Sequence, residues 1–274
     1  MFTKKLNKAV SYIGRYLCNF RGKRFAEEIE RIVDLFHRGL NNVNFDIERN
    51  GELRVLMLFS KFKPTCFFDI GANKGSWSQM VSEMNPSSII HAFEIVPSTY
   101  KELVENTKSL ENIKPNGFGL SNKEETIPVF LGKDSETATG HKIEGMSYHN
   151  QYYIREIYCK TRKACDYMNE QNIDFIDYVK IDVEGMELQV LQGFEDRIKD
   201  IRVIQFEYGI FNISSHALLA DFCRFLREKG FVVGKIFPKH VKFFDYHFDM
   251  ENFHGSNYLA VRNHETLLIE RLQG

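Results

Sequence analysis

Hydrophobic residues occur along most of this chain in short apolar runs, separated by segments in which they recur at helical spacing. The runs predict strands over 66–70, 89–93, 113–120, 126–131, 176–181, 201–206, 231–237 and 257–261. The other segments predict helices over 52–61, 76–84, 97–110 and 164–170, one that ends at Gly193 and one over 214–230. Strands that alternate with helices in this way predict an α/β fold with a doubly wound, mainly parallel sheet. Residues 132–163 show neither pattern, and their length and aromatic content predict a lid or a substrate-binding loop.

The first 49 residues follow a different pattern, and we expect them to form a helical extension of a main domain over 50–274. Residues 1–24 contain seven bases and no acid, and their apolar residues recur at steps of three and four. A second helix is expected over 25–40 and a short strand over 43–47. Three interpretations of the basic amphipathic segment stay open: peripheral contact with an anionic membrane surface, pairing with a partner or in a homodimer, and packing on its own domain.

Composition narrows the class of protein only a little. The net charge of -1 gives no indication of a nucleic-acid partner. The five cysteines are scattered and form no CxxC pair, and no apolar run is long enough to cross a bilayer. These features predict a cytoplasmic protein, either free or peripheral to the inner face of the membrane.

The most informative stretch is FFDIGANKG, residues 67–75, in which a strand leads directly into two glycines. Gly71 and Gly75 predict a tight turn whose backbone can approach a ligand closely. Four of the predicted strands end in an acid, namely Asp69, Glu94, Asp182 and Glu207. Because the carboxyl ends of parallel strands share one edge of a sheet, we expect these four side chains to meet beside the turn.

The position of Glu94 predicts the kind of ligand that the turn holds. It follows Gly71 by roughly 20 residues, a spacing at which an acid can accept hydrogen bonds from ribose hydroxyls. The ligand is therefore expected to contain a nucleoside. GANKG has GxxxG spacing and not GxGxxG, so a dinucleotide is not required. Trp77, which follows the turn, is expected to pack in the core behind it or to face the ligand.

Five motifs occur in an order that resembles the FkbM family of S-adenosylmethionine-dependent methyltransferases. They are FFDIGANKG, HAFE, LSN, KIDVEG and QFEY, at residues 67–75, 91–94, 120–122, 180–185 and 205–208. The resemblance covers roughly residues 50–262. It implies a class I methyltransferase fold, which is Rossmann-like, with a seven-stranded sheet and a final antiparallel strand. It also implies O-methylation of a hydroxyl group on sugars or on natural products such as polyketides.

The resemblance further implies which residues bind S-adenosylmethionine. The cofactor loop would consist of Asp69, Gly71, Ala72, Asn73 and Gly75. Glu94 would hold the ribose, Ser121 would lie near the adenine, and the methionine moiety would lie near the glycine loop. Asp182 is expected to orient the acceptor or the amino group of the cofactor.

The KIDVEG stretch is where we expect the chemistry. Lys180 and Asp182 point to the same side of one strand, Glu184 follows at the turn, and Glu207 can face them from the next strand. In one interpretation, Asp182 and Glu207 bind a divalent cation such as Mg²⁺ or Mn²⁺, which lowers the pKa of the acceptor. In the other, Glu184 or Lys180 is a general base and no metal takes part.

Three histidines are further candidates for the base, although a surface position is favoured for each: His141, His149 and His216. The leading hypothesis for the function is methylation of a hydroxyl on a sugar, a glycan or a polysaccharide precursor. Tailoring of a polyketide or another small natural product is the first alternative. A nicotinamide-dependent Rossmann enzyme and a non-catalytic cofactor-binding module are the further alternatives.

Overall fold

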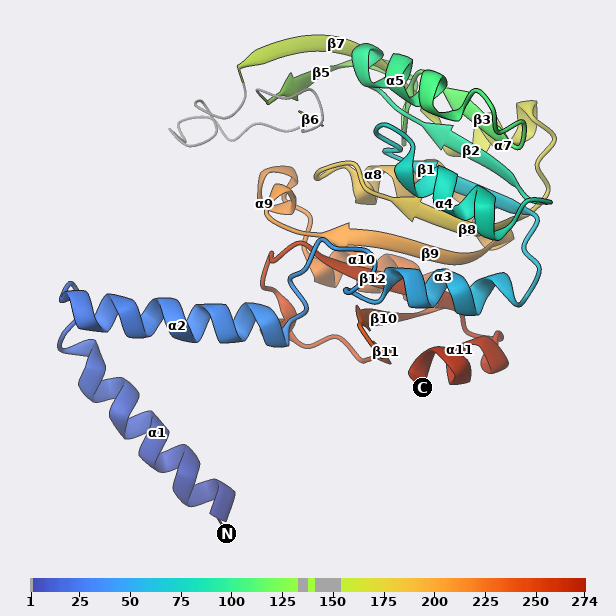
Figure 1. Ribbon diagram of the computed structural model, residues 1–274. Coiled ribbons are helices and arrows are strands. Elements are labelled where there is room, and N and C mark those ends of the chain that lie inside the picture. The colour runs from blue at the N-terminus through green and yellow to red at the C-terminus, as the bar shows by residue number, and fades with distance from the viewer. Residues whose placement is uncertain (1, 133–137, 141–153) are drawn as a thin grey trace. The chain divides into compact units, whose positions relative to one another are not determined.

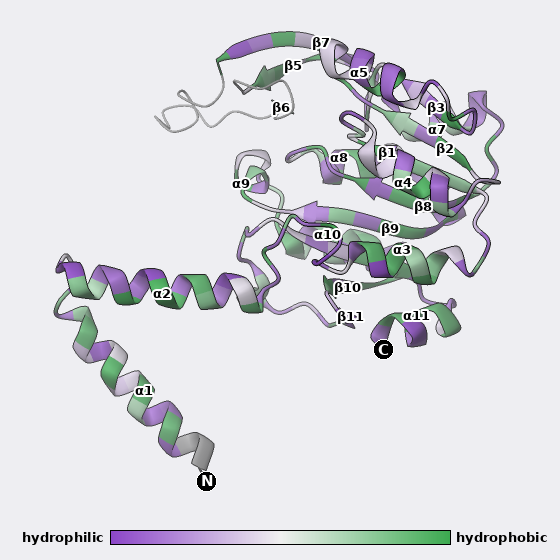
Figure 2. Cartoon of the chain, viewed as in Figure 1, coloured by the Kyte–Doolittle hydropathy of each residue, from purple (hydrophilic) through white to green (hydrophobic). Residues whose placement is uncertain are grey.

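The computed structural model of the protein describes residues 2–132, 138–140 and 154–274 (Figure 1). The chain divides into two compact units, Met1–Val43 and Asn44–Gly274. The first unit consists of helices α1 (Phe2–Cys18) and α2 (Arg24–Leu40). Hydrophobic and hydrophilic residues alternate along both helices (Figure 2), and no residue of α2 is buried. None of the helices in the described ranges is long and apolar enough to cross a membrane.

The strand expected over 43–47 is not formed, and that prediction is wrong. Residues 43–46 have no regular structure and 47–49 form a turn. Side chains take the backbone donors that a strand would use: Asn44 accepts from the N–H of Asp46 at 3.0 Å, and Asp46 accepts from the N–H of Glu48 at 3.0 Å.

The second unit is built on a twisted main sheet, whose strand order is β11-β10-β12-β9-β8-β1-β2-β3. The bounds are β1 Cys66–Ile70, β2 Ile89–Phe93, β3 Ile113–Asn116, β8 Ile176–Ile181, β9 Ile201–Tyr208, β10 Phe231–Phe237, β11 His240–Phe243 and β12 Ser256–Arg262. Strands β3, β2, β1, β8 and β9 pair in parallel, whereas β12 is antiparallel to both β9 and β10. The predicted class I methyltransferase fold is confirmed. The sheet has eight strands and not seven, because β11 extends it as a hairpin with β10.

Helices cover both faces of this sheet (Figure 1). One face packs against α3 (Glu52–Ser60), α4 (Ser76–Met84), α5 (Pro97–Thr107) and α11 (Thr266–Gln273). The other packs against α7 (Ala164–Glu170), α8 (Glu187–Gly193) and α10 (Leu219–Glu228). The helix expected over 214–230 is two helices, α9 (Phe211–Ser215) and α10. Every residue of β1 is buried between the two helical layers. Because β1 lies between β8 and β2, its carboxyl end is at an interior position of the sheet edge.

A second, four-stranded sheet with the order β4-β7-β5-β6 corrects two predictions. Its strands are β4 Gly119–Ser121, β5 Glu125–Leu131, β6 Ala138–Thr139 and β7 Arg155–Lys163. The strand expected over 113–120 is divided between β3 of the main sheet and β4 of this one. The loop expected over 132–163 contains β6 and β7, because Cys159 and Thr161 give β7 a buried face that ordinary hydrophobic patterning does not reveal. The parts of that loop at 133–137 and 141–153 lie outside the described residues.

Candidate active site

The turn between β1 and α4 depends on two glycines with positive φ. Gly71 (φ 84°) follows the last residue of β1, and Gly75 (φ 89°) precedes α4. A Cβ on Gly71 would lie 1.8 Å from the carbonyl oxygen of Asp182, so only glycine allows the turn to pass so close to β8. The N–H of Asp182 in turn donates to the carbonyl of Ile70 at 2.9 Å. A ligand bound on the turn therefore lies beside Asp182.

Glu94 directly follows β2, and two backbone N–H groups hold its carboxylate in place. Its Oε2 accepts from Asn73 at 2.9 Å and its Oε1 accepts from Val96 at 2.8 Å. Burial raises the pKa of Glu94, and these hydrogen bonds oppose the shift. The glycine turn and the end of β2 are thus joined through one carboxylate, whose position is the one predicted for a ribose acceptor.

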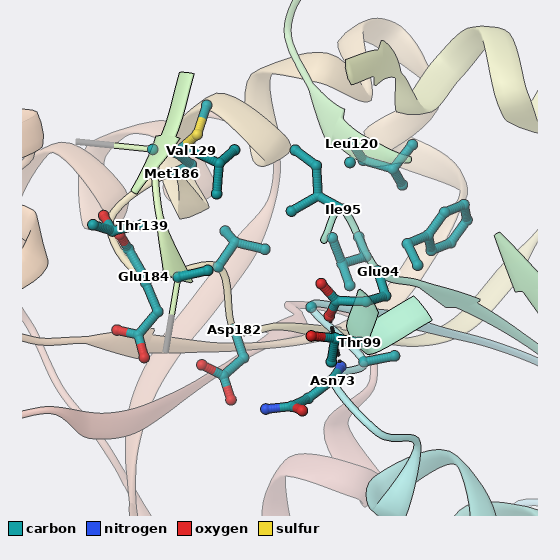
Figure 3. Close-up of a pocket in the computed structure, with 18 of the residues that line it drawn as sticks. Asn73, Glu94, Ile95, Thr99, Leu120, Val129, Thr139, Asp182, Glu184 and Met186 are labelled. Carbon is teal, nitrogen blue, oxygen red and sulfur yellow. Dashed lines mark hydrogen bonds between the residues drawn. The ribbon is translucent and has the colours of Figure 1, made fainter. Parts of the chain in front are cut away.

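A cavity of about 370 Å³ lies between the glycine turn, the ends of β2 and β8, and the second sheet (Figure 3). Its polar wall includes Gly71, Ala72, Asn73, Glu94, Lys180, Asp182 and Glu184. Its apolar wall comes mainly from the second sheet and the segments beside it: Leu120, Ile127, Val129, Ala138 and Met186. A charged wall opposite an apolar one suits a ligand that combines an aromatic base with a charged tail.

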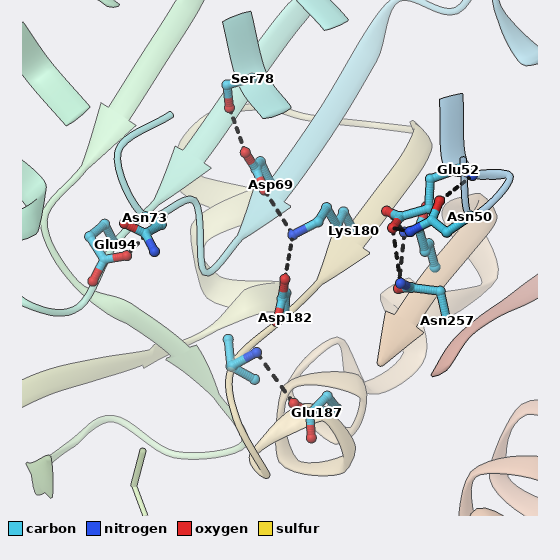
Figure 4. Close-up of polar contacts among 12 residues, drawn as sticks. Asn50, Glu52, Asp69, Asn73, Ser78, Glu94, Lys180, Asp182, Glu187 and Asn257 are labelled. Atoms are coloured by element: carbon cyan, nitrogen blue, oxygen red, sulfur yellow. Dashed lines mark hydrogen bonds and ion pairs between the residues drawn. The ribbon is translucent and has the colours of Figure 1, made fainter. Parts of the chain in front are cut away.

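Lys180, on β8, lies between the carboxylates of Asp69 and Asp182 (Figure 4). Its Nζ is 2.9 Å from Oδ2 of Asp182 and 3.9 Å from Oδ1 of Asp69. Burial by itself lowers the pKa of Lys180, but the charges of Asp182, Asp69 and Glu52 outweigh it and the net shift is upward. The raised pKa favours the protonated form of Lys180, so of the two bases considered, Glu184 or Lys180, the carboxyl suits that role better.

Asp69 lies behind the glycine turn and does not form part of the cavity wall. Its side chain is completely buried, and its Oδ2 accepts from the hydroxyl of Ser78 at 2.7 Å. Burial raises the pKa of Asp69, while the charge of Lys180 and the hydrogen bond from Ser78 lower it. Asp69 thus connects β1, β8 and the first turn of α4 from below the turn.

The turn after β8 presents Glu184 in a left-handed backbone conformation, with φ of 52°. Glu187, the first residue of α8, holds this turn by accepting from the N–H of Gly185 at 3.0 Å and of Val183 at 3.3 Å. Its second oxygen accepts from the side-chain amide of Asn212 at 3.1 Å. Three donors from two elements therefore fix the carboxylate that supports the turn.

The second sheet and α9 hold the same turn from its other sides. Thr139 of β6 donates its hydroxyl to the carbonyl of Glu184 at 2.7 Å. A Cβ on Gly185 (φ 103°) would lie 2.8 Å from the carbonyl oxygen of Phe211, the first residue of α9. The left-handed conformation of Glu184 is thus maintained by its surroundings, and its carboxyl group is kept at the cavity wall.

Four carboxyl groups crowd this edge of the sheet: Asp182, Glu184, Glu187 and Glu207. Burial, followed by the charge of Asp182, raises the pKa of Glu184 to about 9. Burial also raises the pKa of Glu187 to about 7. Burial and the charges of Asp182 and Glu184 raise the pKa of Glu207 well above its usual range. Because these carboxyls destabilise one another's ionised forms, the edge favours a ligand that brings positive charge.

The divalent cation predicted at Asp182 and Glu207 does not fit this arrangement. In the described ranges, no group of three or more His, Cys, Asp or Glu side chains is placed to hold a metal ion. Asp182 is already bonded to the protonated amine of Lys180.

Besides Asp69, the predicted cofactor residues Gly75 and Ser121 lie outside the cavity wall, and Trp77 contributes to the wall from the core. Trp77 packs against Phe67 and Tyr178, with ring centroids 6.3 and 6.0 Å away, and it also forms part of the cavity wall. Trp77 therefore packs in the core as expected, and its contact with the ligand stays a prediction. Ser121 is buried outside the cavity wall, where the preceding residue Leu120 takes the expected place.

One of the three histidine candidates, His216, lies in the described ranges, and it is not brought to the site. His216 is exposed, has a φ of 56° and ends α9 outside the cavity wall, so its surface alternative holds. His141 and His149 lie outside the described residues.

Two residues that hold the turn after β8 were not predicted from the sequence: Glu187 and Thr139. Glu187 had a signal, an acid in the first helical turn after a glycine, whereas the two-residue strand that carries Thr139 had none.

The crowded carboxyls predict how stability depends on pH. Glu184 and Glu187 hold protons more tightly in the folded protein than in the unfolded chain, where their pKa is near 4.5. Their contribution to stability is complete below about pH 4.5 and is lost as the pH rises through about 7 and about 9. Urea unfolding should therefore show a free energy that falls less steeply with rising pH in Glu184→Gln than in the parent. An identical slope in the two proteins would contradict this.

The chain is similar to known methyltransferases in sequence. A family model described as the methyltransferase FkbM domain matches residues 69–233. The 2-O-methyltransferase NoeI of Sinorhizobium fredii is 23% identical over 165 residues, which are 57% of this chain and 68% of that protein. The hexuronic acid methyltransferase AglP of Haloferax volcanii is 25% identical over 218 residues, which are 76% and 81%.

One solved structure is a methyltransferase FkbM from Methylobacillus flagellatus, which covers 73% of this chain and 44% of that one at 13% identity. Its TM-score is 0.45. The family match spans more than half of the chain and runs from Asp69 at the end of β1 to β10. It supports S-adenosylmethionine as the methyl donor and an enzyme over a nicotinamide-dependent protein or a binding module. The chain belongs to the FkbM family of methyltransferases.

Proposed function

We propose that the protein transfers the methyl group of S-adenosylmethionine to a hydroxyl oxygen of a sugar or glycan. The observation that carries this proposal is that one cavity has the carboxylate of Glu94 at one end and the carboxyl group of Glu184 at the other. Figure 3 places Glu94 and Asn73 at one end and Glu184 at the other, with Asp182 between them. The first end suits a nucleoside, and the second suits an acceptor that must lose a proton.

The residues of the first end would bind the donor. Each oxygen of Glu94 accepts one backbone N–H and has a lone pair left for a ribose hydroxyl. The backbone of Gly71 and Ala72 can approach the ligand closely because the turn carries little side-chain bulk. When bound, S-adenosylmethionine supplies a methyl group on a positively charged sulfur, and the crowded carboxyls near Asp182 favour that charge.

Glu184 is the residue that we assign as general base. In its ionised form it would accept the proton of the acceptor hydroxyl while the oxygen attacks the methyl carbon, and it would later release that proton to water. Its pKa of about 9 falls when a cation occupies the cavity, which brings a carboxylate base closer to neutral pH. Asp182, fixed by Lys180, would orient the acceptor. Holding the reactants in line can contribute roughly 7–11 kcal/mol to the reduction of the barrier.

A polyol acceptor suits the remaining carboxyls. Asp182 and Glu184 both line the cavity, so neighbouring hydroxyls of a sugar ring could bond to both, while Glu207 faces Asp182 from β9 outside the cavity wall. Two of the relatives support this choice by name, one as a 2-O-methyltransferase and one as a hexuronic acid methyltransferase. Tailoring of a natural-product alcohol has no separate observation in its favour.

The donor assignment predicts a loss of affinity in Glu94→Ala. Removal of an acceptor of charged hydrogen bonds should weaken binding of S-adenosylhomocysteine by roughly 10- to 100-fold, as measured by calorimetry. His216→Ala, an exposed change outside the cavity, is the control and should bind as the parent does. Equal affinities in all three proteins would show that the ribose is not held at Glu94.

The assignment of the base predicts a different result for Glu184→Gln. Its kcat should fall by roughly 10²- to 10⁴-fold while S-adenosylhomocysteine still binds with nearly the parent affinity. The parent rate should rise with pH around a midpoint between about 4.5 and about 9, and this rise should be absent from the variant. Glu83→Gln, on the exposed side of α4, is the control. A variant that keeps the parent rate and pH profile would exclude Glu184 as the base.

The acceptor class is tested with the donor labelled in its methyl group. Hexuronosides and neutral glycosides should acquire label on oxygen, and polyketide alcohols of similar size should not. Transfer to the polyketide alcohols with no transfer to any glycoside would replace the sugar assignment with the natural-product alternative. Glu184→Gln serves as the background control in each reaction.

A further inference from the structure

Helix α1 exposes an apolar stripe that nothing in its own unit covers. Leu6, Val10 and Ile13 recur at steps of four and three, so they share one face of the helix, and their exposed fractions are 52%, 59% and 55%. Tyr16, three residues after Ile13, is exposed beside them, and Tyr12 is exposed between this stripe and the basic side of the helix. A contiguous apolar surface of this kind is costly in water and marks a surface that contacts something else.

The charges of α1 are all of one sign, which distinguishes it from α2. α1 contains the bases Lys4, Lys5, Lys8 and Arg15 and no acid, whereas α2 contains the acids Glu27, Glu28, Glu30 and Asp34 together with its arginines. Ion pairs join Arg24 to Glu28 at 3.5 Å and Arg21 to Glu30 at 2.8 Å. In the described ranges, no ion pair involves Lys5, Lys8 or Arg15. These three bases of α1 are thus available to an external anion.

The spacing separates these bases from the apolar stripe. Lys8 and Arg15 are seven residues apart and share a face, and that face lies on the other side of the helix from Leu6 and Ile13. An amphipathic helix with a basic polar face and tyrosines at its flank matches the headgroup region of an anionic bilayer. A second copy of α1 could cover the stripe, but it would leave the basic face without an anionic partner, whereas an anionic bilayer offers both.

The length of α1 indicates how it would lie. At 1.5 Å per residue its 17 residues extend roughly 25 Å, and it is not apolar enough to cross a bilayer. We propose that α1 lies in the surface of a membrane that contains anionic lipids, with its apolar stripe among the acyl chains and its bases at the lipid phosphates. This contact is separate from the catalytic chemistry and does not depend on the identity of the acceptor.

Co-sedimentation of the full chain with vesicles tests this proposal. The parent should bind phosphatidylcholine vesicles that contain phosphatidylglycerol and should bind pure phosphatidylcholine vesicles much more weakly. Added salt should weaken the binding, because the attraction is partly electrostatic. Reversal of three bases, in the variant Lys5→Glu, Lys8→Glu, Arg15→Glu, should weaken it by at least roughly 100-fold.

The other helix offers a matched control. Arg24→Glu, Arg31→Glu, Arg38→Glu changes the net charge by the same amount on α2 and should retain most of the binding. Equal loss in both triple variants, or parent binding that does not distinguish the two vesicle types, would overturn the proposal. Affinity for S-adenosylhomocysteine should match the parent in every variant, which shows that the second unit is folded.

A further variant tests the apolar stripe and a competing occupant. Leu6→Ser, Ile13→Ser keeps the charge of α1 and should lose vesicle binding. Light scattering of the parent and this variant reports on self-association. The contrary result is a parent dimer that does not bind anionic vesicles, together with a variant that is a monomer. In that case a second copy of the chain covers the stripe, and the membrane proposal is wrong.

Discussion

The close approach of β1 and β8 is the constraint on which the rest of the site depends. Gly71 passes so near the carbonyl of Asp182 that a single methyl group would collide with it, and the N–H of Asp182 closes the contact through Ile70. This approach places the donor turn and the KIDVEG stretch on one cavity although more than a hundred residues separate them. A side chain at position 71 would have to move β8, and with it Lys180 and Asp182.

The buried charges next to this contact are kept in place by their partners. Lys180 bridges Asp69 and Asp182, and one strand further along, Glu52 of α3 accepts from Gln205 and Asn257 (Figure 4). Burying so many charges is costly unless each is bonded, so these contacts position the site more than they add to stability. They also explain why Lys180 favours its protonated form, which is why we propose a carboxyl as the proton acceptor.

The part of the site around the glycine turn could be predicted from the sequence, because the positions of its residues follow from local rules. A strand, a glycine turn and an acid at the end of the next strand placed Gly71, Asn73 and Glu94 correctly on one cavity. The part of the site around Lys180 and Glu184 depends on contacts between residues far apart in the sequence, and such contacts leave no local pattern. Thr139 reaches Glu184 from a second sheet, and the upward pKa shift of Lys180 comes from carboxylates on other strands and on α3. β7 was missed for a related reason, since its buried face carries Cys and Thr in place of larger apolar residues.

A crystal structure with bound S-adenosylhomocysteine tests the central claim most directly, that one cavity joins a donor end at Glu94 to an acceptor end at Glu184. The account predicts ribose hydroxyls within hydrogen-bonding distance of the Glu94 carboxylate, and the sulfur directed toward the end of the cavity that Glu184 and Asp182 form. A ligand whose ribose lies away from Glu94, or whose sulfur faces the apolar second sheet, would contradict it.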